Sequence, residues 1–141
     1  MKRSGFTLVE ILIVVIILGI LAAIVIPQFT QASNDARTNA LASDLQTVRS
    51  QLQLYKVQHL DNFPGATMST LLTTRTDQTG TIGTDANQFP LGPYLQKFPT
   101  NAFAGNSNVK IGDPPGTGPE GWDYNPSTGA FFPNDSEHSG M

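Results

Sequence analysis

The chain has 141 residues, with 8 Lys or Arg, 11 Asp or Glu and no cysteine. This length accommodates one domain at most besides a membrane segment, and the lack of cysteine excludes disulfides and thiolate metal sites. A formal net charge of −3 without a basic run argues against nucleic acid as a primary partner.

The first feature along the chain is an apolar segment, residues 6–26, which follows Lys2 and Arg3 and contains one ionisable side chain, Glu10. About 20 apolar residues in a helix span roughly 30 Å, the thickness of the hydrocarbon core of a bilayer. We therefore predict a transmembrane helix with its N-terminus in the cytoplasm, because basic residues favour that side. A signal peptide cut after Ala23 is the alternative, although its apolar region is usually about 7–15 residues long.

The sequence becomes polar after Pro27 but keeps a helical period. Apolar residues recur at steps of three and four, which places them on one helix face: Leu41, Leu45, Val48, Leu52 and Tyr55. We predict one helix from about residue 6 to residue 58, bent at Pro27. Its amphipathic continuation, residues 27–60, is expected to pack on a globular head.

Residues 61–141 are expected to form this small head, because Pro64 and Gly65 break the helix. Residues 74–87 are rich in Thr, Gly, Asp and Gln and are predicted to be a surface loop. Further along we predict a helical turn at 68–73, an edge strand at 109–111, a β-hairpin at 121–132 and a loose tail at 134–141. The predicted fold class is α+β, a long N-terminal helix packed on a small antiparallel sheet.

Residues 5–10, Gly-Phe-Thr-Leu-Val-Glu, together with the basic leader and the apolar helix, resemble the N-terminus of prepilins. These are the precursors of type IV pilins and of type II secretion pseudopilins. The resemblance implies that residues 1–5 are a leader peptide, which a prepilin peptidase removes by cleavage between Gly5 and Phe6. It also implies N-methylation of the new amine on Phe6 and a role for Glu10 in assembly.

The chemistry of Glu10 is compatible with that role. A carboxylate and an amine are each costly in lipid and attract one another strongly there, so the Phe6 amine of a neighbour can neutralise Glu10. The alternative is that Glu10 lies at the interface and reaches water. Gly19 and Pro27 bracket a stretch that resembles the part of pilin helices that loosens in filaments, although Gly19 also suits close helix packing.

The head carries a looser likeness. Residues 92–103 resemble a segment of major pseudopilins, except that Asn101 and Ala102 replace the usual Asp-Pro, and no Asp-rich calcium loop is obvious. No cofactor is expected. Since Ca²⁺ takes six to eight oxygen ligands, scattered carboxylates of the head are weak calcium candidates that otherwise belong to the solvated surface: Asp113, Glu120, Asp123 and Asp135.

The resemblance implies a structural filament subunit, most similar to a pseudopilin that serves protein export. A type IV pilin of a surface pilus, for adhesion, motility or DNA uptake, is the alternative. A membrane-tethered binding module that never polymerises is a further one. No serine-hydrolase, zinc-protease or phosphate-loop motif is present, so an enzyme is not expected. His59 and His138 are expected to be surface residues.

The implied partners are further copies and other pilin-like subunits, the prepilin peptidase and an inner-membrane assembly platform. The expected location is the bacterial inner membrane, with a single pass and the head in the periplasm, followed by a periplasmic or surface filament.

Overall fold

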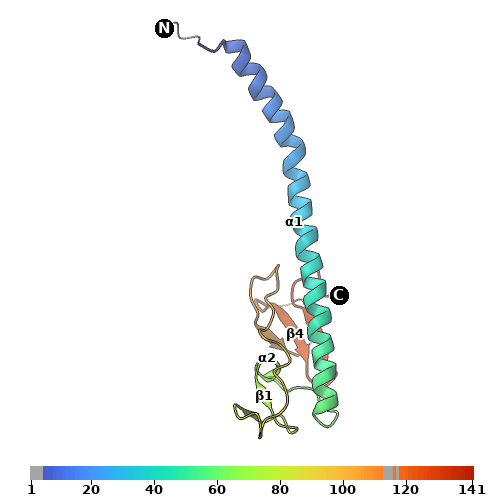
Figure 1. Ribbon diagram of the computed structural model, residues 1–141. Helices are drawn as coiled ribbons and strands as arrows, with labels where there is room; N and C mark the ends of the chain where they lie inside the picture. Colours follow the sequence, from blue (N-terminus) through green and yellow to red (C-terminus); the bar gives the residue numbers. More distant parts are fainter. Residues whose placement is uncertain (1–4, 113–115, 117) are drawn as a thin grey trace. The chain divides into compact units, whose positions relative to one another are not determined.

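The computed structural model describes residues 5–112, 116 and 118–141 and divides into two compact units, Met1–Ala36 and Arg37–Met141. Helix α1, Leu8–Gln58, runs from the first unit into the second (Figure 1). The other elements belong to the second unit: α2 (Met68–Thr73), β1 (Arg75–Thr76), β2 (Ile82–Gly83), β3 (Val109–Ile111), β4 (Trp122–Asn125) and β5 (Ala130–Pro133).

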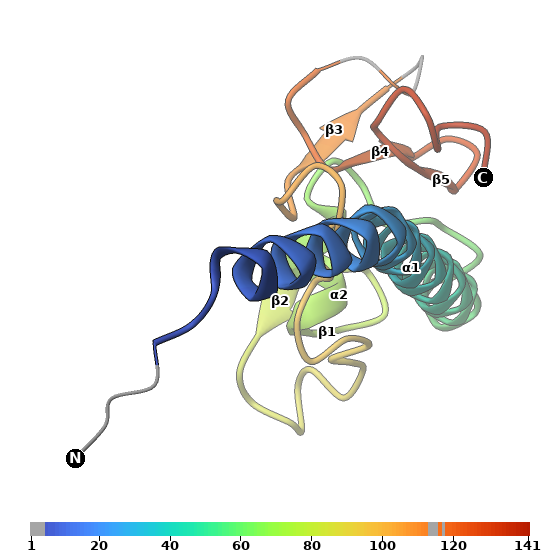
Figure 2. The same cartoon turned by 90° about the horizontal axis from the view of Figure 1, so that it is seen from above.

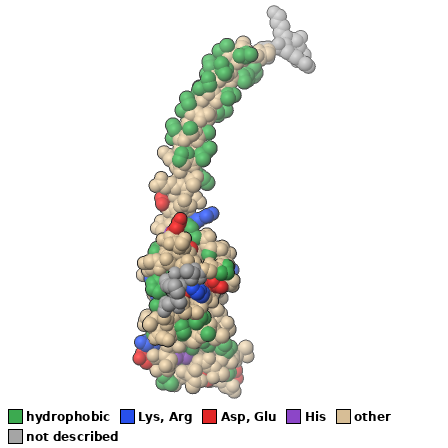
Figure 3. All heavy atoms as spheres, turned by 180° about the vertical axis from the view of Figure 1, so that it is seen from behind, with side chains coloured by type: hydrophobic (Ala, Val, Ile, Leu, Met, Phe, Trp, Pro, Cys, Tyr) green, Lys and Arg blue, Asp and Glu red, His purple; other side chains and the backbone are tan. Residues whose placement is uncertain are grey.

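The described residues of the first unit are the N-terminal part of α1 and the three residues that precede it. Pro27 lies inside the helix, and the predicted helix over residues 6–58 is confirmed to within two residues. By length and composition α1 is apolar enough to cross a membrane. The large apolar side chains of α1 between residues 8 and 29 are exposed, and the face drawn in Figure 3 is apolar along this segment.

The second unit is built on the predicted apolar stripe of α1. Leu41, Leu45, Val48, Leu52 and Tyr55 are each at most 3% exposed, which confirms the helical period. They form one core with Trp122, Tyr124 and Phe131 of the hairpin and with Met68 and Leu72 of α2. Full burial of one such side chain contributes about 1.5–3 kcal/mol, so this shared core is what holds the short strands against the helix.

Helix α1 ends at Gln58, and two residues just after it adopt a left-handed backbone conformation. Leu60 and Asp61 both have positive φ, at 55° and 66°, and the Asp61 N–H donates to the Lys56 carbonyl at 3.0 Å. Left-handed residues of this kind satisfy the free carbonyls at a helix C-terminus. An ion pair between Lys56 and Asp61, at 3.4 Å, supports the same turn.

Strands β3, β4 and β5 form one sheet in that order and lie side by side in Figure 2. Strands β4 and β5 are the predicted hairpin. Its turn needs Gly129, because φ is +73° there and an added Cβ would overlap the ring of Phe63. Strand β3 differs from the expected antiparallel arrangement: it pairs in parallel with β4, Val109 opposite Trp122, so both strands begin at the same end of the sheet.

Two local expectations were wrong. Residues 74–87 contain the short antiparallel pair β1 and β2 rather than loop alone. His59 is 2% exposed rather than solvated, and its ring stacks on Tyr55 with centroids 3.6 Å apart. Its Nδ1 lies 2.8 Å from the Tyr55 carbonyl oxygen and its Nε2 lies 2.9 Å from the Thr76 hydroxyl. Because a carbonyl only accepts, Nδ1 carries a proton and donates it to this oxygen.

Candidate functional site: the N-terminal segment and the carboxylates of the head

Thr7 and Glu10 form a reciprocal cap at the start of α1. The Thr7 N–H and hydroxyl donate to Glu10 Oε2 at 2.9 and 2.7 Å, and the Glu10 N–H donates to the Thr7 hydroxyl oxygen at 3.3 Å. This is the arrangement of a capping box, which satisfies donors that the first helical turn leaves free. The structure therefore holds the Glu10 carboxylate at the N-terminal end of the apolar helix.

The predicted cleavage bond lies just before this cap. Gly5, Phe6 and Thr7 precede α1 in non-helical backbone, and the Phe6 side chain is 82% exposed. Exposed, non-helical backbone is the form in which proteases take their substrates. Lys2, Arg3 and Ser4 of the expected leader lie outside the described residues.

The helix that follows exposes large apolar side chains in every direction. Each Leu, Ile and Val between Leu8 and Ile26 is 51–82% exposed, and Phe29 is 77% exposed. A helix apolar on all sides is one that a membrane or other protein must cover. Gly19 lies in this helix, where an added Cβ would meet no heavy atom within 4 Å, and Pro27 closes the apolar segment. Loosening between them stays a prediction.

Three of the four calcium candidates of the head, Glu120, Asp123 and Asp135, belong to the described residues, and they do not form a group that could hold a metal ion. Asp123 is fully buried, and its Oδ2 lies 3.7 Å from Lys110 Nζ on the neighbouring strand. Asp135 contacts His138 and Asn101, while Glu120 is half-buried and Asp113 lies outside the described residues. Across residues 5–112, 116 and 118–141, no group of three or more His, Asp or Glu side chains is placed to hold a metal ion.

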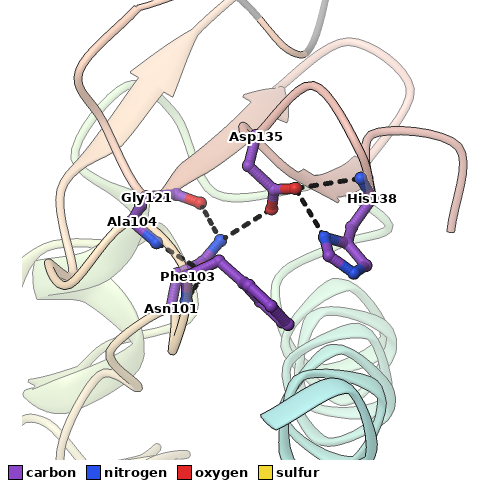
Figure 4. A network of polar contacts seen from close by, with 6 residues as sticks. All are labelled: Asn101, Phe103, Ala104, Gly121, Asp135 and His138. Atoms are coloured by element: carbon purple, nitrogen blue, oxygen red, sulfur yellow. Dashed lines mark hydrogen bonds and ion pairs between the residues drawn. The ribbon is translucent and has the colours of Figure 1, made fainter. Parts of the chain in front are cut away.

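Asp135 instead belongs to a polar network that the sequence did not indicate (Figure 4). His138 contacts Asp135 through its ring Nδ1, at 2.6 Å, and its ring stacks on Phe103. Partial burial raises the pKa of the Asp135 carboxyl, but hydrogen bonds from His138 and Asn101 outweigh it, and the net pKa lies below its ordinary value. The expected surface position of His138 and the loose tail at 134–141 are both wrong, since this segment is packed on the head.

Comparison with known proteins shows which proteins the chain is similar to. The prokaryotic N-terminal methylation motif matches residues 1–26. Type II secretion system core protein G of Klebsiella michiganensis is 30% identical over 105 residues, which is 74% of this chain and 71% of the relative. The protein of the same name from Pseudomonas aeruginosa is 45% identical over 62 residues, 44% of this chain, and the match spans 42% of that relative's length. No solved structure matches the chain significantly.

These matches agree with the two parts of the structure that the resemblance singled out. The methylation motif covers the exposed apolar helix with its capped glutamate, and the longer alignment, at 74% of the chain, also takes in part of the head. The chain belongs to the family of type II secretion system core protein G, the major pseudopilins, which is not an enzyme family.

Proposed function

We propose that this chain is a filament subunit of a type II secretion system, made as an inner-membrane precursor and polymerised through residues 6–26. The observation that supports this most is the N-terminal part of α1, whose apolar side chains are exposed on all sides while the head has a core of its own. Such a surface needs cover from lipid at first and then from the helices of neighbouring subunits.

In this proposal Glu10 sets how far one subunit is shifted along the filament relative to the next. Cleavage between Gly5 and Phe6 leaves an amine on Phe6 but keeps the Thr7 N–H, so the cap on Glu10 survives processing. The carboxylate is then held in a fixed place at the helix end, where the amine of a neighbouring Phe6 can pair with it. The attraction is strong because the surroundings are apolar.

The family resemblance supports a membrane topology and a set of partners for this subunit. Lys2 and Arg3 place the N-terminus in the cytoplasm, where a prepilin peptidase cleaves the leader, and the head lies in the periplasm. Phe6 is then N-methylated, and an inner-membrane assembly platform adds the subunit to a filament of further copies and other pilin-like subunits. The filament serves protein export.

Intact mass and N-terminal sequencing of the protein from its native membrane fraction test this processing. A chain that begins at Phe6 and carries one added methyl group is expected. A chain that still begins at Met1, or that begins after Ala23, would contradict the filament role and favour a tethered or secreted binding module.

Deletion of the gene distinguishes a role in type II secretion from a role in a surface pilus. Loss of the gene is expected to stop export through the type II system and to leave surface pili and motility unchanged. Loss of pili with intact export would assign the subunit to a type IV pilus instead.

A further inference from the structure

Both oxygens of the Asp135 carboxylate accept hydrogen bonds from nitrogen. Oδ1 accepts from the His138 backbone N–H at 2.9 Å and contacts the His138 ring Nδ1 at 2.6 Å. Oδ2 accepts from Asn101 Nδ2 at 3.4 Å. Asn101 lies 34 residues before Asp135 in the chain, whereas His138 lies three residues after it, and Figure 4 shows both converging on the one carboxylate.

Asn101 is the residue that joins these parts. It is fully buried, and its Oδ1 accepts from the N–H groups of Phe103 and Ala104 at 2.8 and 3.1 Å. Its Nδ2 also donates to the Gly121 carbonyl at 2.7 Å, just before β4. The side chain of Asn101 therefore ties its own loop, the start of β4 and the C-terminal turn together.

The turn is closed by further contacts of the same segment. The Ser139 N–H donates to the Asp135 carbonyl at 3.1 Å, and the Asn134 N–H donates to the Gly121 carbonyl at 3.0 Å. The His138 and Phe103 rings stack with centroids 4.2 Å apart. Aromatic contact and hydrogen bonds thus hold residues 134–139 on the head from two sides.

We propose that Asn101, Asp135 and His138 form a lock that fastens the C-terminal turn without a cation. Ca²⁺ needs six to eight oxygen ligands, whereas the atoms that face Asp135 are nitrogen donors and the Asn101 oxygen is already occupied by two N–H groups. These hydrogen bonds stabilise the charged carboxylate, a role that a bound cation would otherwise have. The fold of the head is therefore independent of calcium, and this holds whether or not the chain forms filaments.

Thermal unfolding of the full-length chain in detergent tests the lock. Trp122 is the single tryptophan of the chain and is fully buried, so its fluorescence reports unfolding of the head. The unfolding midpoint is expected to be the same in millimolar calcium and in chelator. A midpoint that rises with calcium would overturn the proposal, and Asp113→Asn would then show whether the acid outside the described residues binds the ion.

Asn101→Asp tests the lock itself, because it places a second carboxylate against Asp135 and removes the amide donor. Its midpoint in chelator is expected to fall by about 4–8 °C, the shift that loss of one such interaction produces in a domain of this size. Asn87→Asp adds the same charge at an exposed position and is expected to leave the midpoint unchanged.

A midpoint of Asn101→Asp equal to that of the wild type would contradict the lock. Should that variant fail to fold, His138→Ala removes the ring donor and the stack on Phe103 but keeps the backbone donor. A smaller fall in the midpoint is then expected, and an unchanged midpoint would overturn the proposal.

Discussion

The carboxylate of Glu10 and the hydroxyl of Thr7 are hydrogen-bonded at 2.7 Å, and this contact lies at the end of the apolar helix where the two residues cap one another. Glu10 therefore has two roles: its charge is needed in the proposed assembly, and its carboxylate also caps the start of α1. Charge and capping are separable by substitution, because an amide oxygen accepts the bonds from Thr7 but carries no charge.

Glu10→Gln and Glu10→Ala separate these two roles. If the charge pairs with the Phe6 amine of a neighbour, both variants are expected to insert into the membrane and to be processed, yet to give few filaments. Filament yield is measured by shearing or cross-linking, with membrane fractionation as the control for insertion. Normal filaments from Glu10→Gln with defective ones from Glu10→Ala would show that only the cap matters.

The parts of the fold that depend on periodicity were predictable from the sequence. The steps between Leu41 and Tyr55 placed the buried face of α1 correctly, and the hairpin predicted at residues 121–132 is confirmed as the pair β4 and β5. His59 also continues this face four residues after Tyr55, so its burial was readable from the same period. The capping box was visible too, as a threonine followed three residues later by glutamate ahead of an apolar run.

The parts that depend on distant contacts were not predictable. A three-residue strand such as β3 carries no information about its direction, which is set by the connection to β4. The polar network depends on the hydrogen bond between Asn101 and Asp135, and no local sequence pattern predicts a contact between residues so far apart in the chain. From the sequence, Asp123 was expected to be a solvated surface carboxylate. It is buried beside Lys110 of the neighbouring strand, and the sequence does not reveal which strand lies next to it.

Arg49 is expected to be a stabilising contact between α1 and β5. Its Nε and Nη2 both donate to the Phe131 carbonyl, at 3.0 and 2.7 Å, and its guanidinium lies 5.5 Å from the ring centre of Phe132. The two N–H groups converge on one carbonyl oxygen from a planar guanidinium, and a lysine ammonium cannot reproduce that pair of bonds. Because the side chain is partly exposed, Arg49→Lys is expected to cost about 1 kcal/mol, or about 4–8 °C in the unfolding midpoint.

The matched control for Arg49 lies on the same helix. Arg37 is exposed, and Arg37→Lys is expected to leave the Trp122 unfolding midpoint unchanged. Equal midpoints for Arg49→Lys and Arg37→Lys would show that the bonds to Phe131 add nothing to stability.

The contributions of Thr76 and His59 to stability are expected to be coupled, because the two buried side chains are hydrogen-bonded to one another. Thr76→Val removes the hydroxyl and leaves His59 Nε2 buried without that partner, which costs about 1–3 kcal/mol. His59→Phe combined with Thr76→Val removes both polar groups, so the double variant is expected to lose less than the sum of the two single variants. Denaturant unfolding of the four proteins measures this difference.

The control for this cycle is an exposed threonine. Thr84→Val is expected to change stability little and to show no coupling to His59→Phe. Additive losses for Thr76 and His59 would mean that the 2.9 Å contact has no energetic role.

Asp77 is expected to titrate below the ordinary range of an aspartate. Its Oδ1 accepts from the Thr79 hydroxyl at 2.7 Å, from the Thr81 N–H at 2.9 Å and from the Thr79 N–H at 2.8 Å. These bonds, that from the Thr79 hydroxyl first, favour the charged form and lower the pKa of the Asp77 carboxyl. The stabilisation is therefore complete above the unfolded-state pKa, about 3.9, and is lost as the pH falls through the folded-state pKa.

Carbon-detected NMR titration of the Asp77 side chain measures this pKa directly. Thr79→Val removes the hydroxyl donor and keeps the backbone donor, so it is expected to move the pKa of Asp77 upward, toward its ordinary value, without abolishing the shift. Thr100→Val, at an exposed threonine elsewhere in the head, is expected to leave the Asp77 titration where it was. If Thr79→Val leaves the pKa unchanged as well, the hydroxyl bond is not what holds the carboxylate in its charged form.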